Sequence, residues 1–453
     1  MGTYVIDSRL FKDQFSTEAM RTIFSDENTV QKWLDVEAAL AKVQAVLGII
    51  PKAAAEEIQK KSRVALIDLD ELKREMDRTA HPIVPLLRLI KKVCTGDAGE
   101  YVHWGATTQD IIDTGTIIQV REALDVMEAE LRELHALLSA LAAKHKAVPM
   151  TGRTHGQQAL PITFGFKVAV WVAEIGRNLQ RLQDMRPRVL VGQFSGAVGT
   201  LAALGDKGIQ VQEDLMRELG LACPEITWHT ARDGIAELSS VLAICTTTIG
   251  KIAHEIYCLQ KTEVGELEEP FAMGKVGSST MPHKRNPPTC ETIVAIAKIV
   301  RSTAPLAFDS MLAEHERDKI GLQIEREMIG RLCCLAHAAL KKILYVIKGL
   351  TVRPENMERN LHIQKGLLMS EAIMMRLGEK FGRQEAHDMV YEVCMGAFEK
   401  DVPLKGALLA HPKIAASLSA AEIDAMLDPH GYVGLSETFV DRVTGNKAAG
   451  KRR

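Results

Sequence analysis

Apolar residues recur every three or four positions over long stretches of this chain, which is the spacing of amphipathic helices. The clearest run starts near Thr116 and ends before Pro149. This alternating spacing is that of a coiled-coil seam, so we predict one helix about 45 Å long at ~1.5 Å per residue. Its apolar positions are Ile117, Val120, Leu124, Met127, Leu131, Leu134, Leu138 and Leu141.

A second run of the same kind extends from Ala231 to Leu259, and Val241 and Ile244 widen its apolar stripe. Three further stretches, 162–182, 288–311 and 322–347, also read as long helices. Five helices of this length predict a bundle. The seam positions of the second run are Ile235, Leu238, Leu242, Cys245, Ile249, Ile252, Ile256 and Leu259.

The two flanks of the bundle have a different pattern. Residues 1–110 hold shorter helical runs broken by turns, and Thr351 opens a further set of short runs to residue 453. Alternating strand patterns are nearly absent. We therefore predict an all-α fold with three domains: 1–110, a central long-helix bundle 111–350, and 351–453.

The long helices are apolar on more than one face, and such a helix is hard to bury within one monomer. We therefore predict an obligate oligomer, in which another copy of the chain covers the surplus face.

Composition narrows the class of protein further. Apolar residues make up 46% and charged residues 25%, with 56 basic side chains against 58 acidic ones. The densest basic run is Lys451-Arg452-Arg453, so we expect no nucleic-acid partner. Residues 1–9 lack the apolar stretch of a signal peptide, and no window reaches the ~18 uninterrupted apolar residues of a membrane span. We expect a cytoplasmic protein without a membrane partner.

The eight cysteines are scattered without the paired spacing of a metal site, and several lie in apolar helical stretches. We interpret them as reduced residues of the core and predict no metal. They are Cys94, Cys223, Cys245, Cys258, Cys290, Cys333, Cys334 and Cys394.

Three segments have a composition that a helical bundle does not require. The strongest is the segment 274–288, here called the signature loop, whose glycines and prolines disfavour a continuous helix. It carries hydroxyls, cations and an amide, which favours a mobile loop that closes over an anion; the alternative is a solvated linker. Its candidate residues are Ser278, Ser279, Met281, Lys284 and Asn286.

The second segment, 151–161, is a polar connection between helices that holds Thr154 and His155. A lone histidine is more often structural, but this one stands in a polar break rather than on an apolar face. The third segment, 101–110, places His103, Thr107, Thr108 and Gln109 just before or at the start of a helix. Hydroxyl and amide donors there suit a carboxylate, whereas the plainer reading is helix capping.

Together the three segments resemble the signature regions of the aspartase/fumarase superfamily, in the family's order and spacing, and the likeness spans nearly the whole chain. The resemblance implies a homotetramer whose central helices form a common bundle and whose active sites each draw on three subunits. It implies a small dicarboxylate substrate, no metal and no cofactor.

The resemblance also implies roles for single residues. Ser278 is expected to remove a proton next to a carboxylate, His155 to protonate the leaving group, and Glu291 to polarise His155. Lys284 and Asn286 are expected to hold the aci-carboxylate dianion. The other residues expected to bind substrate are His81, His103, Thr107, Thr108, Gln109, Thr154, Ser279, Met281 and Arg317.

Within the superfamily, the likeness narrows to the branch of adenylosuccinate lyase and 3-carboxy-cis,cis-muconate cycloisomerase. Segments 19–26, 36–41, 228–233 and 314–317 look more like the cycloisomerase, whereas His155 and His81 resemble the lyase. Leu322 stands in a stretch where that lyase has serines that hold a nucleotide phosphate, and an apolar side chain cannot replace them.

The sequence therefore favours a lyase that breaks a carbon–nitrogen or carbon–oxygen bond of a substituted succinate and releases fumarate, with the leaving group unidentified. The alternatives are the cycloisomerase, adenylosuccinate lyase, or a protein that kept the fold without catalysis.

Overall fold

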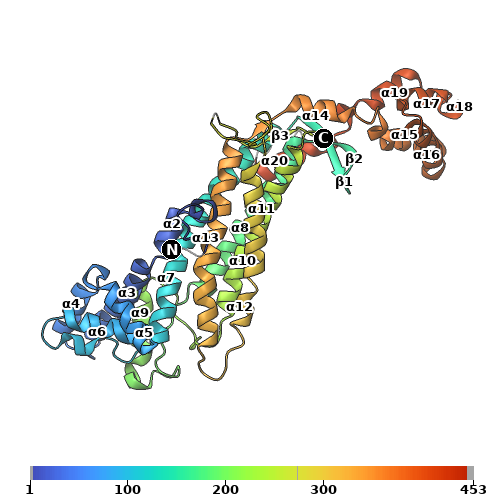
Figure 1. Ribbon diagram of the computed structural model, residues 1–453. Coiled ribbons are helices and arrows are strands. Elements are labelled where there is room, and N and C mark those ends of the chain that lie inside the picture. The colour runs from blue at the N-terminus through green and yellow to red at the C-terminus, as the bar shows by residue number, and fades with distance from the viewer. Residues whose placement is uncertain (1–3, 273, 446–453) are drawn as a thin grey trace. The chain divides into compact units, whose positions relative to one another are not determined.

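The computed structural model describes residues 4–272 and 274–445, and these fold mainly as α-helices (Figure 1). The predicted all-α class is confirmed. The basic run 451–453 lies outside the described residues. By internal packing the chain forms two compact units: unit 1 holds Met1–Leu131, Asn178–Gly250 and Thr292–Lys342, and unit 2 holds Arg132–Arg177, Lys251–Glu291 and Ile343–Arg453. The three-domain division stays a prediction.

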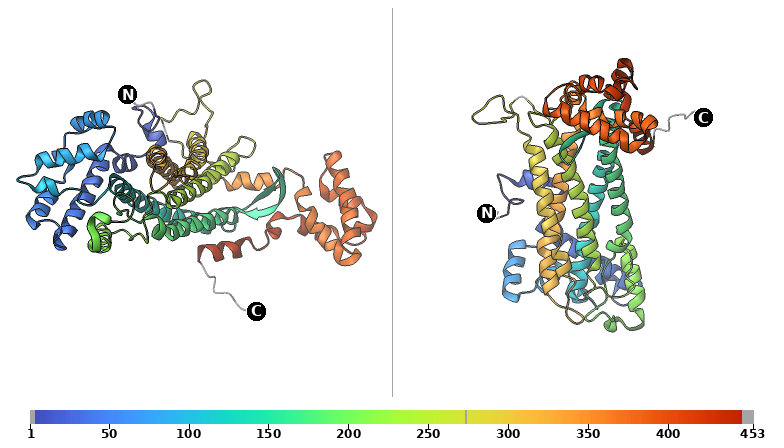
Figure 2. Two further views of the ribbon diagram at one scale, coloured as in Figure 1. Left: turned by 90° about the horizontal axis from the view of Figure 1, so that it is seen from below. Right: turned by 90° about the vertical axis from the view of Figure 1, so that its right-hand side faces the viewer.

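The five predicted long helices are present and run side by side (Figure 2). The apolar seam of α7 is buried from Ile117 to Leu138, and all eight seam positions of α10 are buried. The periodicity therefore identified the faces that form the core. The helices are α7 (Thr108–Lys144), α8 (Phe164–Val189), α10 (Asp233–Leu259), α11 (Pro288–Thr303) and α13 (Ile320–Lys348).

Two boundaries of the long helices differ from the prediction. Helix α7 begins at Thr108 rather than near Thr116, because its first turns bury polar residues that an apolar pattern does not reveal; Gln109, Asp110 and Asp113 are at most 3% exposed. The stretch 288–311 is two helices, since Pro305 has no N–H to continue α11 and instead precedes α12 (Leu306–Asp309).

Three helices of unit 1 begin with a side-chain cap, at Thr17, Ser25 and Asp68; the hydroxyl of Ser25, for example, accepts from the N–H of Asn28. Ala41, Ile50, Ala55 and Ile58 form a small core at the contact of α3 and α4. These elements are α1 (Lys12–Phe15), α2 (Glu18–Ile23), α3 (Asp26–Val46), α4 (Lys52–Lys61), η1 (Val64–Leu66), α5 (Leu69–Thr79), α6 (Ile83–Val93), η2 (Ala98–Tyr101), η3 (Ala202–Lys207) and α9 (Gly208–Leu219).

Unit 2 contains a β-hairpin where the sequence predicted only a polar connection. Strands β1 (Pro149–Thr154) and β2 (Gln157–Thr163) pair antiparallel, with an irregular register between Thr151 and Arg153. That irregularity interrupts the two-residue alternation by which a strand is recognised, so no strand pattern is visible in this segment. Strand β3 (Leu267–Glu268) pairs with β4 (Thr351–Val352).

The short helices that follow Thr351 also belong to unit 2 (Figure 1). Ile373, Leu377, Leu404 and Leu408 are fully buried in their shared core. The elements are α14 (Pro354–Leu361), η4 (Leu367–Met369), α15 (Ser370–Phe381), α16 (Arg383–Glu399), α17 (Leu404–Ala410), α18 (Pro412–Ala415), α19 (Ala420–Leu427), η5 (Pro429–Tyr432) and α20 (Ser436–Thr444).

Among the described residues, α10 alone is long and apolar enough to cross a membrane by length and composition. Because 61% of its most apolar window is buried in the protein, it has the burial of a core helix. All eight cysteines are free thiols, and Cys245, Cys290, Cys333 and Cys334 are buried as predicted. Cys223 is exposed, which corrects its assignment to the core. The described residues contain no cluster of three or more His, Cys, Asp or Glu suited to a metal.

Candidate functional site

The first turn of α7 is organised around one buried carboxylate in unit 1. Asp110 is fully buried and accepts hydrogen bonds from the N–H groups of Thr107 (3.0 Å), Ser195 (3.1 Å) and Gly196 (3.0 Å). The Nε2 of His229 lies 2.8 Å from the Oδ1 of Asp110. Four partners on one carboxylate fix the start of the helix against the loop at 195–196.

Arg317 reaches the same place from the segment before α13. Its Nη1 donates to the Oγ1 of Thr107 at 2.7 Å, and its Nη2 donates to the carbonyl of Ala197. Its Nε is buried and has no hydrogen-bond partner in the part of the chain that the structure describes. The guanidinium and the hydroxyl of Thr107 thus keep donors for an incoming anion, and the prediction that Arg317 belongs with the threonines is consistent with this placement.

His81 is tied to Thr108 in a defined tautomer. The N–H of Val84 donates to the Nδ1 of His81 at 3.2 Å, so Nε2 carries the proton of the neutral ring and donates to the Oγ1 of Thr108 at 3.1 Å. Burial and the charge of Lys319 lower the pKa of His81, which favours the neutral ring. The Thr108 hydroxyl accepts this bond, so its own proton is available to a substrate.

His103 has the opposite electrostatic setting. Its Nδ1 lies 2.6 Å from the Oε1 of Glu37, whose side chain is 1% exposed. Burial by itself lowers the pKa of His103, but the charge of Glu37 and the hydrogen bond outweigh burial and raise it. His103 also has φ 65°, in the left-handed region that few residues other than glycine adopt. The raised pKa favours the protonated ring, and the bond to Glu37 fixes its orientation.

Gln109 differs from its neighbours because its side chain is 1% exposed. Its Nε2 donates to the Oδ2 of Asp113 (3.1 Å) and to the carbonyl of His229 (2.9 Å), so both amide hydrogens are used within the protein. Direct contact of Gln109 with a substrate stays a prediction that requires these bonds to exchange.

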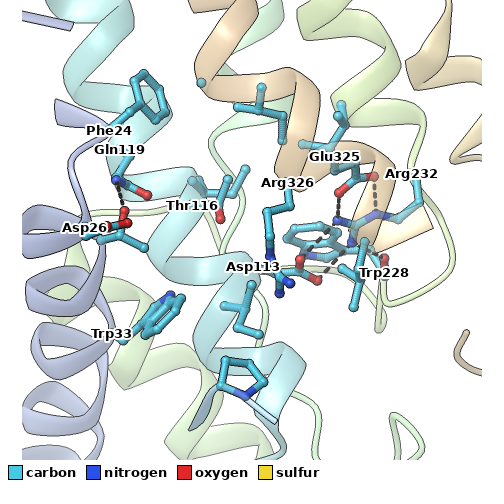
Figure 3. Close-up of a pocket in the computed structure, with 18 of the residues that line it drawn as sticks. Phe24, Asp26, Trp33, Asp113, Thr116, Gln119, Trp228, Arg232, Glu325 and Arg326 are labelled. Atoms are coloured by element: carbon cyan, nitrogen blue, oxygen red, sulfur yellow. Dashed lines mark hydrogen bonds and ion pairs between the residues drawn. The ribbon is translucent and has the colours of Figure 1, made fainter. Parts of the chain in front are cut away.

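Asp113 is part of a buried ion-pair network (Figure 3). The guanidinium of Arg232 binds Asp113 at 2.9 and 3.0 Å and also binds Glu325 through two nitrogens, one of them at 2.8 Å. All three side chains are at most 5% exposed, and the ring of Trp228 lies 4.8 Å from the guanidinium. The two carboxylates raise the pKa of Arg232 despite its burial, so Arg232 is a fixed cation that links α7, α10 and α13.

In unit 2, His155 occupies the tip of the β-hairpin. Thr154 pairs with Gln157, which leaves His155 and Gly156 as a two-residue turn with φ values of 52° and 79°. Two positive φ values are those of a type I′ turn, which histidine tolerates better than most residues and glycine adopts freely. Thr154 and His155 are exposed, and no hydrogen bond or ion pair within the described residues involves the His155 ring.

The end of β1 next to this turn is fixed by a buried carboxylate. The two terminal nitrogens of Arg153 bind the two oxygens of Glu266 at 3.0 and 2.7 Å, and the Glu266 side chain is fully buried. The Nδ2 of Asn360 adds a third bond to Glu266 at 2.8 Å. Anchoring at Arg153, two residues before His155, keeps the tip from swinging freely.

The signature loop is anchored at both ends. The Oε1 of Glu269 accepts from the Nζ of Lys275 at 2.9 Å, and the Oε2 of Glu269 accepts from the N–H of Cys290 at 2.9 Å. Asn286 donates through Nδ2 to the carbonyl of Gly277 at 2.7 Å, and a Cβ on Gly277 would lie only 2.0 Å from the carbonyl oxygen of Lys284. The two stretches of the loop, at Gly277 and Lys284, cross so closely that only glycine fits at position 277.

Ser278 follows that crossing. Its Oγ accepts from the N–H groups of Thr280 at 3.3 Å and Met281 at 3.0 Å, so its own proton is not held by either bond. The side chains of Ser279, Met281, Lys284 and Glu291 are exposed, and within the described residues no hydrogen bond or ion pair involves them.

The predicted residues therefore gather in two sets. His81, Thr107, Thr108, Gln109 and Arg317 are bonded to one another or to shared partners in unit 1, whereas His155 and the signature loop belong to unit 2. No contact between His155 and Glu291 exists among the described residues, so their expected pairing stays a prediction.

Sequence reasoning missed the buried acids that hold these residues, because their partners lie far away in the chain. Two signals for them were available in the sequence. Asp110 ends a predicted segment, and the acids Glu266, Glu268 and Glu269 stand close together before the signature loop. The missed residues are Glu37, Asp110, Asp113, Glu266, Glu269 and Glu325.

Comparison with known proteins identifies the family of this chain. A family model described as Lyase matches residues 13–301, and one described as Adenylosuccinate lyase C-terminus matches residues 366–443. An N-acetyl-S-(2-succino)cysteine lyase of Dickeya dadantii is 42% identical over 443 residues, covering 98% of this chain and 97% of the relative. An adenylosuccinate lyase of Methanocaldococcus jannaschii is 40% identical over 446 residues, covering 98% and 96%.

Among solved structures, the 3-carboxy-cis,cis-muconate lactonizing enzyme from Pseudomonas putida superposes with a TM-score of 0.91 at 38% identity, covering 97% of this chain and 98% of that one. The relatives thus include both lyases and a cycloisomerase, as the branch resemblance implied. The chain belongs to the fumarate lyase superfamily and is an enzyme of that superfamily.

Proposed function

We propose that this enzyme eliminates a substituent from a 2-substituted succinate and releases fumarate. Ser278 removes a proton from the carbon next to one carboxylate, and the electron pair moves onto that carboxylate as an aci-carboxylate. The pair then forms the double bond as the bond to the leaving group breaks, and His155 gives the leaving group its proton. Atoms balance as fumarate plus the protonated leaving group.

The observation that carries this proposal is the hydrogen bonding of the Ser278 hydroxyl. Two N–H groups, from Thr280 and Met281, donate to its oxygen. Hydrogen-bond donors to this oxygen stabilise the negative charge that it carries after losing its proton. An ordinary serine lacks this stabilisation and is therefore too weak a base. The crossing at Gly277, held by Asn286, fixes this arrangement.

The cluster at the start of α7 supports the binding of a dicarboxylate. The hydroxyls of Thr107 and Thr108 retain free protons, and the guanidinium of Arg317 retains one donor. These donors stand at the N-terminal end of a 37-residue helix, where the field favours an anion. Lys284 adds a mobile cation for the aci-carboxylate, and Asn286 acts by positioning the loop.

We further propose that the active site is shared by three subunits of a homotetramer. His155, Lys284 and Glu291 are exposed in the single chain, which suits side chains completed by another copy. Bundle helices also expose large apolar side chains, such as Val170 on α8 and Ile244 on α10, at 43% and 45%. The proposed compartment is the cytoplasm.

The bond that breaks joins the succinate to nitrogen, oxygen or sulfur. The sequence favoured carbon–nitrogen or carbon–oxygen bonds, and the Dickeya relative, whose name places the succino group on sulfur, adds carbon–sulfur. An activity screen with fumarate and a panel of amines, thiols and alcohols, read in the addition direction, tests all three. If the enzyme adds none of these compounds to fumarate, the proposal is contradicted.

The second candidate is 3-carboxy-cis,cis-muconate cycloisomerase, because the segment 228–233 resembles that enzyme and the Pseudomonas putida structure superposes closely. Its test is turnover of 3-carboxymuconate. Turnover of that compound alone would replace the lyase assignment. Adenylosuccinate, tested in parallel, covers the third candidate.

A further inference from the structure

A pocket of about 340 Å³ in unit 1 lies beside the donor cluster, the group formed by Thr107, Thr108 and Arg317 (Figure 3). Ile112 lines it one turn after Thr108 on α7, and Pro82 lines it directly after His81. Most of its wall is apolar or aromatic. Its apolar lining includes Phe24, Trp33, Met76, Trp228, Leu322 and Ile329.

Some charged side chains of this pocket are fully paired within the protein, and others can still bind a ligand. All five N–H donors of Arg232 are used by Asp113, Glu325 and the carbonyl of Trp228, so this network offers the pocket a net charge of −1 and no free donor. Arg326 is exposed, and among the described residues its side chain is bonded only to Gln323, at 2.9 Å.

Arg326 is therefore the cation available to a ligand, and Figure 3 draws it in the pocket near Asp113. Asp26 also lines the pocket and is exposed, so three acids face two arginines. A phosphate dianion needs several donors and an excess of positive charge, and this wall has neither. A single carboxylate matches one guanidinium.

We propose that this pocket holds the leaving group of the substrate, and that the leaving group is small, mainly apolar and carries one carboxylate, which pairs with Arg326. The inference rests on the proposed elimination, because only then does a substrate have a part that leaves. The volume suits a small molecule, since ligand pockets start at roughly 300 Å³.

Calorimetric binding to the intact wild-type enzyme tests the pocket without turnover. The probes are N-acetylmethionine, its methyl ester and AMP. We expect the acid to bind, the ester to bind about tenfold more weakly because it lacks the charge-assisted bonds, and AMP to bind more weakly than the acid.

Arg326→Gln should lower the affinity for the acid to that for the ester. The matched control is Arg331→Gln, on the same helix but paired with Glu327 and outside the pocket lining; it should bind like the wild type. The proposal is overturned if the acid does not bind, if acid and ester bind equally, if AMP binds more tightly, or if Arg326→Gln changes nothing. Failure of the elimination itself appears separately, as absent fumarate addition with pocket binding intact.

Discussion

The donor cluster at the start of α7 and the proposed catalytic segments of unit 2 differ in how their side chains are held. In the cluster, Thr107, Thr108 and Arg317 are bonded to one another or to His81, and Asp110 accepts from three backbone N–H groups and pairs with the ring of His229. In unit 2, His155 and Lys284 extend into solvent from a turn and a loop whose bases are fixed.

The difference follows from what each group must do. Donors that bind a carboxylate gain from a prearranged geometry, because no reorganisation is needed when the charge arrives. Under the proposed function, the acid and the base serve a site completed by another chain, so they must project beyond their own chain and find no partner within it. The comparison therefore predicts local effects in the cluster and subunit-dependent effects in unit 2.

The largest effect is expected for Ser278→Ala. Loss of the base should lower kcat by about 10³- to 10⁴-fold, the upper range for a general base. The backbone of the loop should persist, because alanine removes only the acceptor of two loop hydrogen bonds and leaves the anchors at Glu269 and Asn286 in place. Fumarate formation measured on the purified enzyme, with its oligomeric state from light scattering, gives the readout.

Ser279→Ala is the matched control, since its side chain is exposed and lacks a partner among the described residues. It should retain far more activity than Ser278→Ala. Equal losses in the two variants would remove the special role of Ser278.

The second effect concerns stability in unit 1. Arg232→Met leaves the carboxylates of Asp113 and Glu325 buried without their cation, which should cost about 3–5 kcal/mol of unfolding free energy. Urea unfolding measures this loss. The variant that adds Asp113→Asn and Glu325→Gln should recover part of it, and no recovery would show that burial of unpaired charge is not the cause.

The third effect is expected for His155→Asn, where asparagine tolerates the positive φ of the turn. Loss of the acid should lower kcat by about 10²- to 10³-fold for a poor leaving group. Crystal or circular-dichroism comparison with the wild type checks that the hairpin is unchanged.

Mixing inactive Ser278→Ala and His155→Asn subunits sharpens the comparison. If the base and the acid of one site come from different chains, unfolding and refolding the two together should restore a substantial part of the activity, because some sites receive both intact residues. Continued inactivity of the mixture, with mixed tetramers demonstrated by mass spectrometry, would contradict shared sites.

The smallest effect is a pair of opposed pH dependences at about pH 5–8, where histidine titrates. The folded pKa of His103 is raised, so its stabilisation is full below the unfolded pKa and is lost as pH rises through the folded pKa. The folded pKa of His81 is lowered, so its contribution is present above the unfolded pKa and is lost as pH falls through the folded pKa. The free energy of unfolding, measured across this range, should lose its fall with rising pH in His103→Gln and its fall with falling pH in His81→Gln. Loss of the same trend in both variants would contradict the assignment.

The sequence by itself determined the helical class, the core faces of α7 and α10, and the segments that carry polar chemistry. Each of these depends on residues near one another in the chain, such as the seam from Ile117 to Leu138, whose spacing is the helical repeat. The family followed from the order of three such segments.

Only the tertiary structure decided how those segments are held. Asp110 meets Gly196, Arg232 joins Asp113 to Glu325, and Arg153 binds Glu266, all across separations that no local pattern encodes. Burial made these carboxylates significant, because a charge removed from water must find a partner wherever the fold brings one.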